Sequence, residues 1–163
     1  MSVAEVVSSF KFTAIVEGLI TGSPGTQQSV YETAQRVFSD GTGANKAGNV
    51  LYFKSRSLNN TNEDINFTTA LDFQGDAIGA AKIKGLYIKY ESGDAGTYLT
   101  FKQSSSNGVP NITDAAGHGI KIPVGEAMIL TNAVGWTVTA STGDLLNFAT
   151  SCTATYTLVA LVE

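Results

Sequence analysis

Charged side chains are scarce in this chain of 163 residues: Asp, Glu, Lys and Arg make up 15% of it, against roughly 25% in an average soluble protein. The net charge is −4, and Arg36 and Arg56 are its only arginines. Proteins that bind nucleic acid neutralise rows of phosphates with clustered Lys and Arg. Because the sequence holds no such cluster, we expect no direct binding to nucleic acid and none to an anionic membrane surface.

Cysteine and histidine occur once each, as Cys152 and His118. A single cysteine excludes an internal disulfide framework. With no basic residue beside it in sequence, Cys152 is expected to be a small, semi-buried side chain rather than a reactive thiol. One histidine and one distant cysteine do not supply the convergent ligands of a zinc site, so no metal or cofactor is predicted. We expect His118, which lies between two glycines, to hydrogen-bond within its loop.

Long apolar runs are missing too. No stretch approaches the ~18 residues that a membrane-spanning helix needs. The N-terminal segment lacks the basic and apolar regions of a secretory signal. The sequence therefore predicts a protein that is made in a cytoplasm and stays soluble until it assembles with something.

Serine, threonine and glycine are abundant, with 17 glycines alone. Thr, Val, Ile, Tyr and Phe fit a pleated sheet, and Gly with Asn supplies turns. Residues 119–163 contain four short apolar runs separated by Pro-Val-Gly, Asn-Ala-Val-Gly and Ser-Thr-Gly-Asp. Such regular turn chemistry is typical of consecutive antiparallel strands in a sandwich or barrel. We therefore predict an all-β fold with little helix.

The chain is expected to consist of a short arm, residues 1–9, and one β-sandwich domain, residues 10–163. Alternating apolar residues predict strands over 10–17, 29–39, 50–58, 64–71, 82–90 and 98–102. Segment 29–39 also fits a helix, although its Val-Tyr and Val-Phe pairs favour a strand. The segments 82–90 and 98–102 are expected to form a hairpin. Polar loops are predicted over 18–28, 40–49 and 103–118, and a loop as long as the last is usually functional.

No catalytic motif emerges from the sequence. Glycoside hydrolases use two facing carboxyls, but nothing indicates that Glu63 and Asp64, or Asp72 and Asp76, converge on a cleft. No Gly-x-Ser-x-Gly segment presents a nucleophile. Residues 40–45, Asp-Gly-Thr-Gly-Ala-Asn, lack the ending of a phosphate loop and the terminal Glu of a calcium loop. We interpret them as a tight connection and predict that the chain is not an enzyme.

Three blocks together resemble small virion structural proteins of tailed bacteriophages. The blocks are residues 38–49, residues 63–72 with 81–89, and residues 122–130 with 135–149, the last being the most specific. The match extends over about residues 30–162, most of the chain. The resemblance implies a capsid decoration (cement) protein with a jelly-roll-like antiparallel β-sandwich, often assembled as a homotrimer.

In that family the partner is the major capsid protein, and the location is the capsid surface of the virion. We expect the N-terminal segment 1–12 and the loops 18–28 and 103–118 to make the contacts. The candidate partner-binding residues are Val3, Val6, Phe10, Pro24, Ser105, Asn107 and His118.

Two other functions remain open. A head-fibre or tail-fibre domain could bind a host-surface glycan through Trp136, Tyr98 and the loop 104–107, because aromatic rings form sugar platforms. An uncharacterised hydrolase on a sandwich scaffold is the weaker alternative.

Overall fold

The computed structural model describes residues 5–18, 26–72 and 75–163, with side chains from residue 36 onward. Within this part every regular element is a β-strand. The strands are β1 (Glu5–Gly18), β2 (Thr26–Asp40), β3 (Lys46–Ala47), β4 (Asn49–Asn59), β5 (Asn62–Asn66), β6 (Lys82–Ser92), β7 (Tyr98–Gln103), β8 (Gly119–Pro123), β9 (Ala127–Thr137), β10 (Leu145–Ala149) and β11 (Thr153–Val162). The all-β prediction is confirmed, and the ambiguous segment 29–39 lies within β2.

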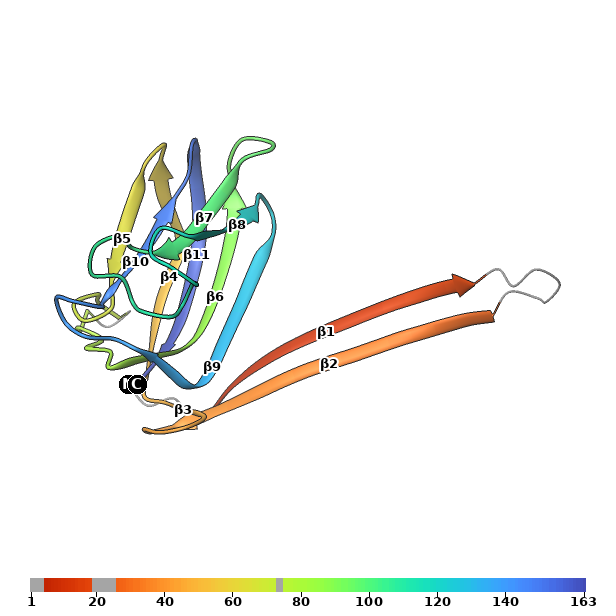
Figure 1. Cartoon of the computed structure of the whole chain (residues 1–163), viewed down its shortest axis with the longest axis horizontal. Helices are drawn as coiled ribbons and strands as arrows, with labels where there is room; N and C mark the ends of the chain where they lie inside the picture. The colour runs from red at the N-terminus through yellow and green to blue at the C-terminus, as the bar shows by residue number, and fades with distance from the viewer. Residues whose placement is uncertain (1–4, 19–25, 73–74) are drawn as a thin grey trace.

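Strands β4 to β11 form a jelly roll. They make two four-stranded sheets in the orders β4-β11-β6-β9 and β5-β10-β7-β8, and all pairings within these sheets are antiparallel. From β4 to β7 and from β8 to β11, each successive strand enters the opposite sheet, which is the double Greek-key order of a jelly roll. Figure 1 shows the two sheets face to face. The predicted antiparallel, jelly-roll-like β-sandwich is confirmed.

The predicted hairpin of residues 82–90 with 98–102 is wrong. These segments are strands β6 and β7, but β6 pairs with β11 and β9, whereas β7 pairs with β10 and β8. The chain between them crosses from one sheet to the other. Gly and Ser in a short polar segment are equally suited to a hairpin turn and to such a crossing, so the local sequence does not separate the two cases.

The apolar core lies between the two sheets. Strands β6 and β11 are buried along most of their length, with Ile83, Ile88 and Leu158 fully covered. At the centre, the Phe148 ring stacks on Tyr156 with 5.0 Å between centroids. Burial of apolar surface of this extent is the main driving force for folding.

The C-terminal third holds four strands, as predicted, but their bounds differ. The predicted separator Pro-Val-Gly, residues 123–125, lies at the junction of β8 and β9. The predicted separator Asn-Ala-Val-Gly, residues 132–135, does not end a strand, because it lies inside β9, which continues to Thr137. Segment 64–71 is strand for only part of its length, since β5 ends at Asn66.

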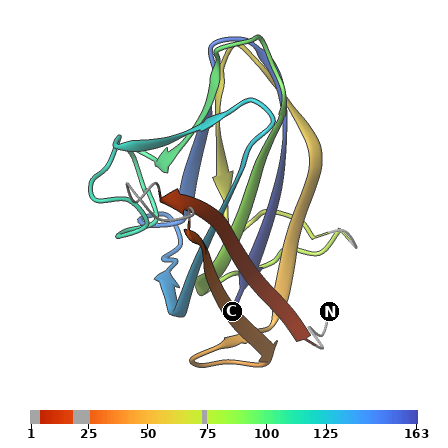
Figure 2. The same ribbon diagram turned by 90° about the vertical axis from the view of Figure 1, so that its right-hand side faces the viewer.

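The first two strands form a hairpin outside the sandwich. β1 and β2 pair in continuous antiparallel register from Glu5 opposite Ser39 to Gly18 opposite Thr26, and β3 pairs in parallel with the end of β2. Figures 1 and 2 show this hairpin running outward from the end of the sandwich that carries β3. The expected arm and loop have different bounds: residues 5–9 belong to β1, and Gly18 and residues 26–28 are also in strands. Residues 10–18 and 26–40 are thus not part of the two sandwich sheets.

Candidate interaction surfaces

A small apolar cluster joins the base of the hairpin to the sandwich. Phe38 on β2 and Ala47 on β3 are fully buried, and they pack with Leu161 on β11 and the partly buried Val50 on β4. Leu161 and Val50 are opposite each other in register. The hairpin base therefore covers one end of the outer face of the β4-β11-β6-β9 sheet.

A buried ion pair fastens the same junction. Lys84 on β6 has no exposed side-chain surface, and its Nζ lies 2.6 Å from Oε2 of Glu163. Nζ also donates to the carbonyl oxygens of Gly43, at 2.8 Å, and Val134, at 2.7 Å. Its three N–H groups are thereby satisfied. Because Glu163 Oε2 also accepts from the amide of Gly43 at 3.1 Å, the pair holds the turn between β2 and β3. We call Gly43, Lys84, Val134 and Glu163 the anchor.

A bulge in β9 shapes the anchor. Between the register pairs Ile83–Trp136 and Gly85–Thr131, β9 inserts extra residues opposite Lys84. Oδ1 of Asn132 accepts from the amides of Val134 and Gly135, at 3.1 and 3.0 Å. Bulges re-aim backbone groups, and this one turns carbonyl groups toward Lys84. The carbonyl of Ala133 also accepts from the amide of Asn45 at 3.0 Å.

The turn before β3 has the backbone conformation that its Gly and Asn residues predict. Gly41, Gly43 and Asn45 have φ angles of 116°, 106° and 55°. These left-handed values favour Gly and Asn. The prediction of a tight connection over residues 40–45 is confirmed.

The ion pair lowers the pKa of Glu163 below its ordinary value of 4.5, chiefly through the hydrogen bond from Lys84. The Gly43 amide and Lys82, whose Nζ lies 3.5 Å from Oε1, act in the same direction. The Glu163 carboxylate is therefore ionised at neutral pH.

A row of four apolar side chains crosses the outer face of the β4-β11-β6-β9 sheet. Tyr52, Val159, Tyr87 and Ile129 come from the four strands and are direct neighbours in register. Tyr52 and Ile129 are each 45% exposed, and the two between them are half-buried. We call these four residues the apolar row. It lies two residues along the strands from Leu161, so it borders the patch that the hairpin base covers.

The predicted contact residues of the long loop are all on the surface. Ser105, Asn107 and His118 lie in the β7–β8 connection and are exposed. The Asn107 carbonyl accepts from the amides of Asp144 and Leu145 at 2.8 and 2.9 Å, so its backbone is held.

The prediction that His118 hydrogen-bonds within its loop is confirmed. Its Nδ1 lies 2.8 Å from Oδ1 of Asp114, and this contact lowers the pKa of the Asp114 carboxyl.

The other predicted contact residues lie in the N-terminal segment. Val6 and Phe10 are in β1, opposite Phe38 and Ala34. Val3 and Pro24 lie outside the described residues. The side chains of Val6 and Phe10 also lie outside the part of the chain whose side chains the structure describes.

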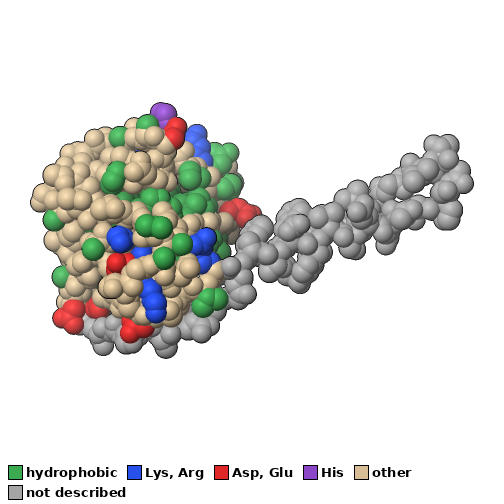
Figure 3. Space-filling model, turned by 60° about the horizontal axis from the view of Figure 1, so that its bottom comes forward, with side chains coloured by type: hydrophobic (Ala, Val, Ile, Leu, Met, Phe, Trp, Pro, Cys, Tyr) green, Lys and Arg blue, Asp and Glu red, His purple; other side chains and the backbone are tan. Residues whose placement is uncertain are grey.

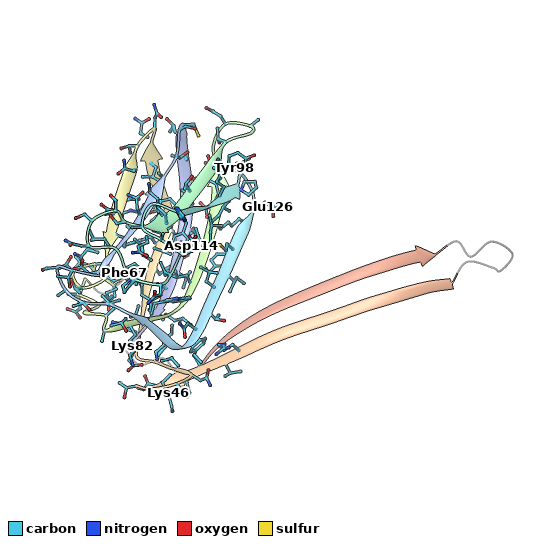
Figure 4. All side chains as sticks on the ribbon, in the orientation of Figure 1. Lys46, Phe67, Lys82, Tyr98, Asp114 and Glu126 are labelled. Carbon is cyan, nitrogen blue, oxygen red and sulfur yellow. The ribbon has the colours of Figure 1, made fainter. Side chains whose placement is uncertain are left out.

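The proposed glycan-binding residues are not brought together. Tyr98 lies at one end of the sandwich, while Trp136 is paired with Ile83 near Lys82, at the opposite end in Figure 4. Tyr98 is 44% exposed, with the Lys121 ammonium 5.4 Å from its ring centroid. Trp136 is half-buried and packs against the core. Ser104 in the loop 104–107 is buried.

Trp136 nevertheless borders a shallow hollow. The residues that line it are Pro110, Asn111, Asn132, Gly135, Trp136 and Thr137. An aromatic edge flanked by amides is chemically suited to a polar ring compound.

The carboxylates that could have formed an acid pair have structural partners. Glu63 accepts from Arg56 at 2.7 Å and from the Tyr156 hydroxyl at 2.6 Å. Asp64 accepts from Asn147 at 2.9 Å. Asp72 accepts from the backbone amide of Asp76 within a turn. Glu63, Asp64 and Asp72 thus each hold a hydrogen bond within the fold.

Cys152 is a small side chain buried in the core, with 6% of its surface exposed. Hydrogen bonding with the hydroxyls of Thr97 and Tyr90 lowers the pKa of the thiol to about 7. Its neighbours are hydroxyl groups and a backbone amide, with no base among its hydrogen-bond partners.

Sequence reasoning missed the anchor and the apolar row. Lys84 looks like an ordinary solvated lysine between Ile83 and Gly85, and no local pattern signals that a bulge in β9 will cover it. The row draws one residue from each of four strands far apart in sequence. Its outward positions could have been found only with the register known.

Among the described residues, no group of three or more His, Cys, Asp or Glu side chains is placed to hold a metal ion. The same part of the chain contains no helix that is long and apolar enough to cross a membrane. Comparison of the chain with protein-family models, with curated proteins and with solved structures found no match.

Proposed function

We propose that this chain is a structural protein of a bacteriophage virion. In this proposal it is a capsid decoration (cement) protein that binds the assembled lattice of the major capsid protein as a homotrimer. The observation that carries the proposal is the hairpin, a two-stranded ribbon that extends from a jelly-roll sandwich and is fastened to it at its base. Its location on the virion, after synthesis in the bacterial host, is part of the same proposal.

The hairpin is suited to contact with other proteins. Within the described residues, β1 pairs only with β2, and β2 pairs with β3 only at Ser39 and Asp40. Most of both outer edges is thus free to pair with another chain. The anchor gives the ribbon a defined direction, which lowers the entropy lost on binding.

The surface of the sandwich is suited to contacts with many neighbouring protein molecules in a virion shell. On the face shown in Figure 3, few side chains are charged, most of the surface is neither charged nor hydrophobic, and several hydrophobic side chains lie close together near the centre and right. A protein that binds only the assembled shell stabilises it by mass action. Many identical contacts add up by avidity, and this mechanism needs no catalytic residue.

The test is the copy number of the chain in purified virions, measured by quantitative mass spectrometry relative to the major capsid protein. A near-equimolar ratio supports a lattice-wide decoration protein. A few copies per particle would overturn the cement role in favour of a fibre or neck component. Complete absence from the particle would overturn the virion role itself.

A second candidate is a fibre domain that binds a host glycan, favoured by the hollow beside Trp136. Binding on a glycan array that is lost in both Trp136→Ala and Asn111→Gly would support it. Asn111 is exposed and has a φ of 63°, a backbone conformation that glycine also adopts, so this substitution removes the amide from the hollow with little disturbance. Absence of binding to any cell-surface sugar would contradict it.

A further inference from the structure

The apolar row lies beside a contact that already exists. In its own chain, Phe38 of the hairpin packs against Leu161 and Val50 on the outer face of the β4-β11-β6-β9 sheet. The apolar row is the neighbouring row on this face, about 7 Å further along the strands. It continues the same surface beyond the area that the hairpin base covers.

The apolar character of Phe38 continues along the β1 half of one face of the hairpin. In a strand every second residue shares a face, so the positions on the face of Phe38 are, by register, Arg36, Ala34, Glu32 and Val30 on β2 and Val6, Ser8, Phe10, Phe12 and Ala14 on β1. The β2 positions alternate between apolar and charged residues, whereas all the β1 positions except Ser8 are apolar. By sequence and register, the ribbon therefore offers apolar positions of the kind used at its base chiefly along β1.

The chain's own hairpin does not cover its own apolar row. Figure 1 shows β1 and β2 running away from the sandwich, and Tyr52 and Ile129 are each 45% exposed. A two-stranded ribbon alone is at best marginally stable in water. Among the described side chains, the row thus lacks a partner of the kind that the base of the hairpin already has.

We propose that the apolar row of one copy is covered by the β1–β2 hairpin of a second copy of this chain. Extending an identical element onto a neighbouring protomer is a low-cost route to a closed oligomer. The proposal deepens the proposed function, on which it rests for its biological setting, by naming a partner of the hairpin. The edges of the ribbon and the β7–β8 connection stay available for the shell.

The first test measures self-association of the purified full-length chain by analytical ultracentrifugation. We expect the wild type to form oligomers, and Ile129→Lys and Tyr52→Lys each to weaken association about tenfold or more, because a lysine would be buried in an apolar contact. The matched control is Leu71→Lys, at a residue that is 55% exposed and outside the sheet. A monomeric wild type, or row variants that associate like Leu71→Lys, would overturn the proposal. Two row variants at opposite edges of the sheet guard against a folding defect in one.

The second test identifies the occupant. In a Cys152→Ala background, a chain with Ala34→Cys is mixed with a chain with Ile129→Cys under mild oxidation. We expect a disulfide-linked pair of the two chains, and none when Leu71→Cys replaces Ile129→Cys. Cross-linking of Ile129→Cys chains only with each other would show that two rows meet directly and would overturn the proposal.

Both tests use the purified chain without virions. A failure to find the chain in virions would therefore leave their results unchanged. Loss of the cross-link would equally leave the copy-number measurement unchanged, so the two proposals fail separately.

Discussion

Replacing Glu163 with glutamine tests whether the anchor holds the hairpin to the sandwich. The change keeps the size of the side chain but removes the charge that lies 2.6 Å from Nζ of Lys84. The fully buried ammonium would keep its two close carbonyl acceptors and lose its counter-charge. Removing one partner of a buried ion pair costs about 3–5 kcal/mol. We expect the lower end, about 3 kcal/mol, because the Glu163 side chain is 12% exposed.

In a chain of this size, that loss corresponds to a fall in Tm of about 6–12 °C. Urea denaturation gives the free energy of unfolding, and hydrogen exchange reports on the amides of Gly43 and Asn45, which bond to Glu163 and Ala133. The matched control is Glu126→Gln, at an exposed glutamate, which should change stability by less than about 0.5 kcal/mol. If Glu163→Gln were as stable as this control, with both amides still protected, the reasoning would be refuted.

The same substitution predicts a change in acid stability. Because the pKa of Glu163 in the folded protein lies below its ordinary value of 4.5, the unfolded state binds its proton first as the pH falls. The contribution of the carboxylate is present above pH 4.5 and is lost as the pH falls through the lower folded-state pKa. The wild type should lose stability more steeply than Glu163→Gln in that acid range. Parallel curves of unfolding free energy against pH would contradict this.

Three further changes test the packing. Phe38→Ala empties a fully buried position and should cost about 3–5 kcal/mol; hydrogen exchange in the hairpin no faster than in the wild type would contradict its role at the base. Tyr156→Phe removes the hydroxyl that donates to Glu63 at 2.6 Å, a charged hydrogen bond worth about 1.5–3 kcal/mol, and a urea midpoint equal to that of the wild type would refute that contribution. Gly108→Ala would place a Cβ against the carbonyl oxygen of Ser104, so we expect a loss of more than about 1 kcal/mol; unchanged thermal unfolding would show that the loop can shift.

Much of the fold was predictable because it depends on local pattern. Apolar and polar residues alternate around Ile83 and Ile88, and turn residues separate the apolar runs. These local patterns predict strands independently of the sheet that each strand joins. The positive φ angles of Gly41 and Gly43 follow from the same local chemistry. The predicted pairing of β6 with β7 failed because two strands joined by a short polar segment can lie in one sheet or in opposite sheets.

The candidate surfaces were predicted less well. Surface positions such as Ser105 and His118 could be placed in a long polar loop, and both are exposed. The sequence did not indicate that the arm would be a hairpin reaching to residue 40, since strand propensity does not tell whether a strand joins the sandwich or leaves it.

Composition and periodicity by themselves determined that this chain is an all-β protein with little charge and with turns at regular intervals. Those properties depend on each residue and its near neighbours. Tertiary structure alone decided that Lys84 is a buried partner of Glu163, since that required a bulge in β9 and a turn more than 40 residues earlier to meet at one point. It also decided that Tyr52 and Ile129 share one exposed row, because cross-strand neighbours are set by register, and register is fixed by the packing of the whole sandwich.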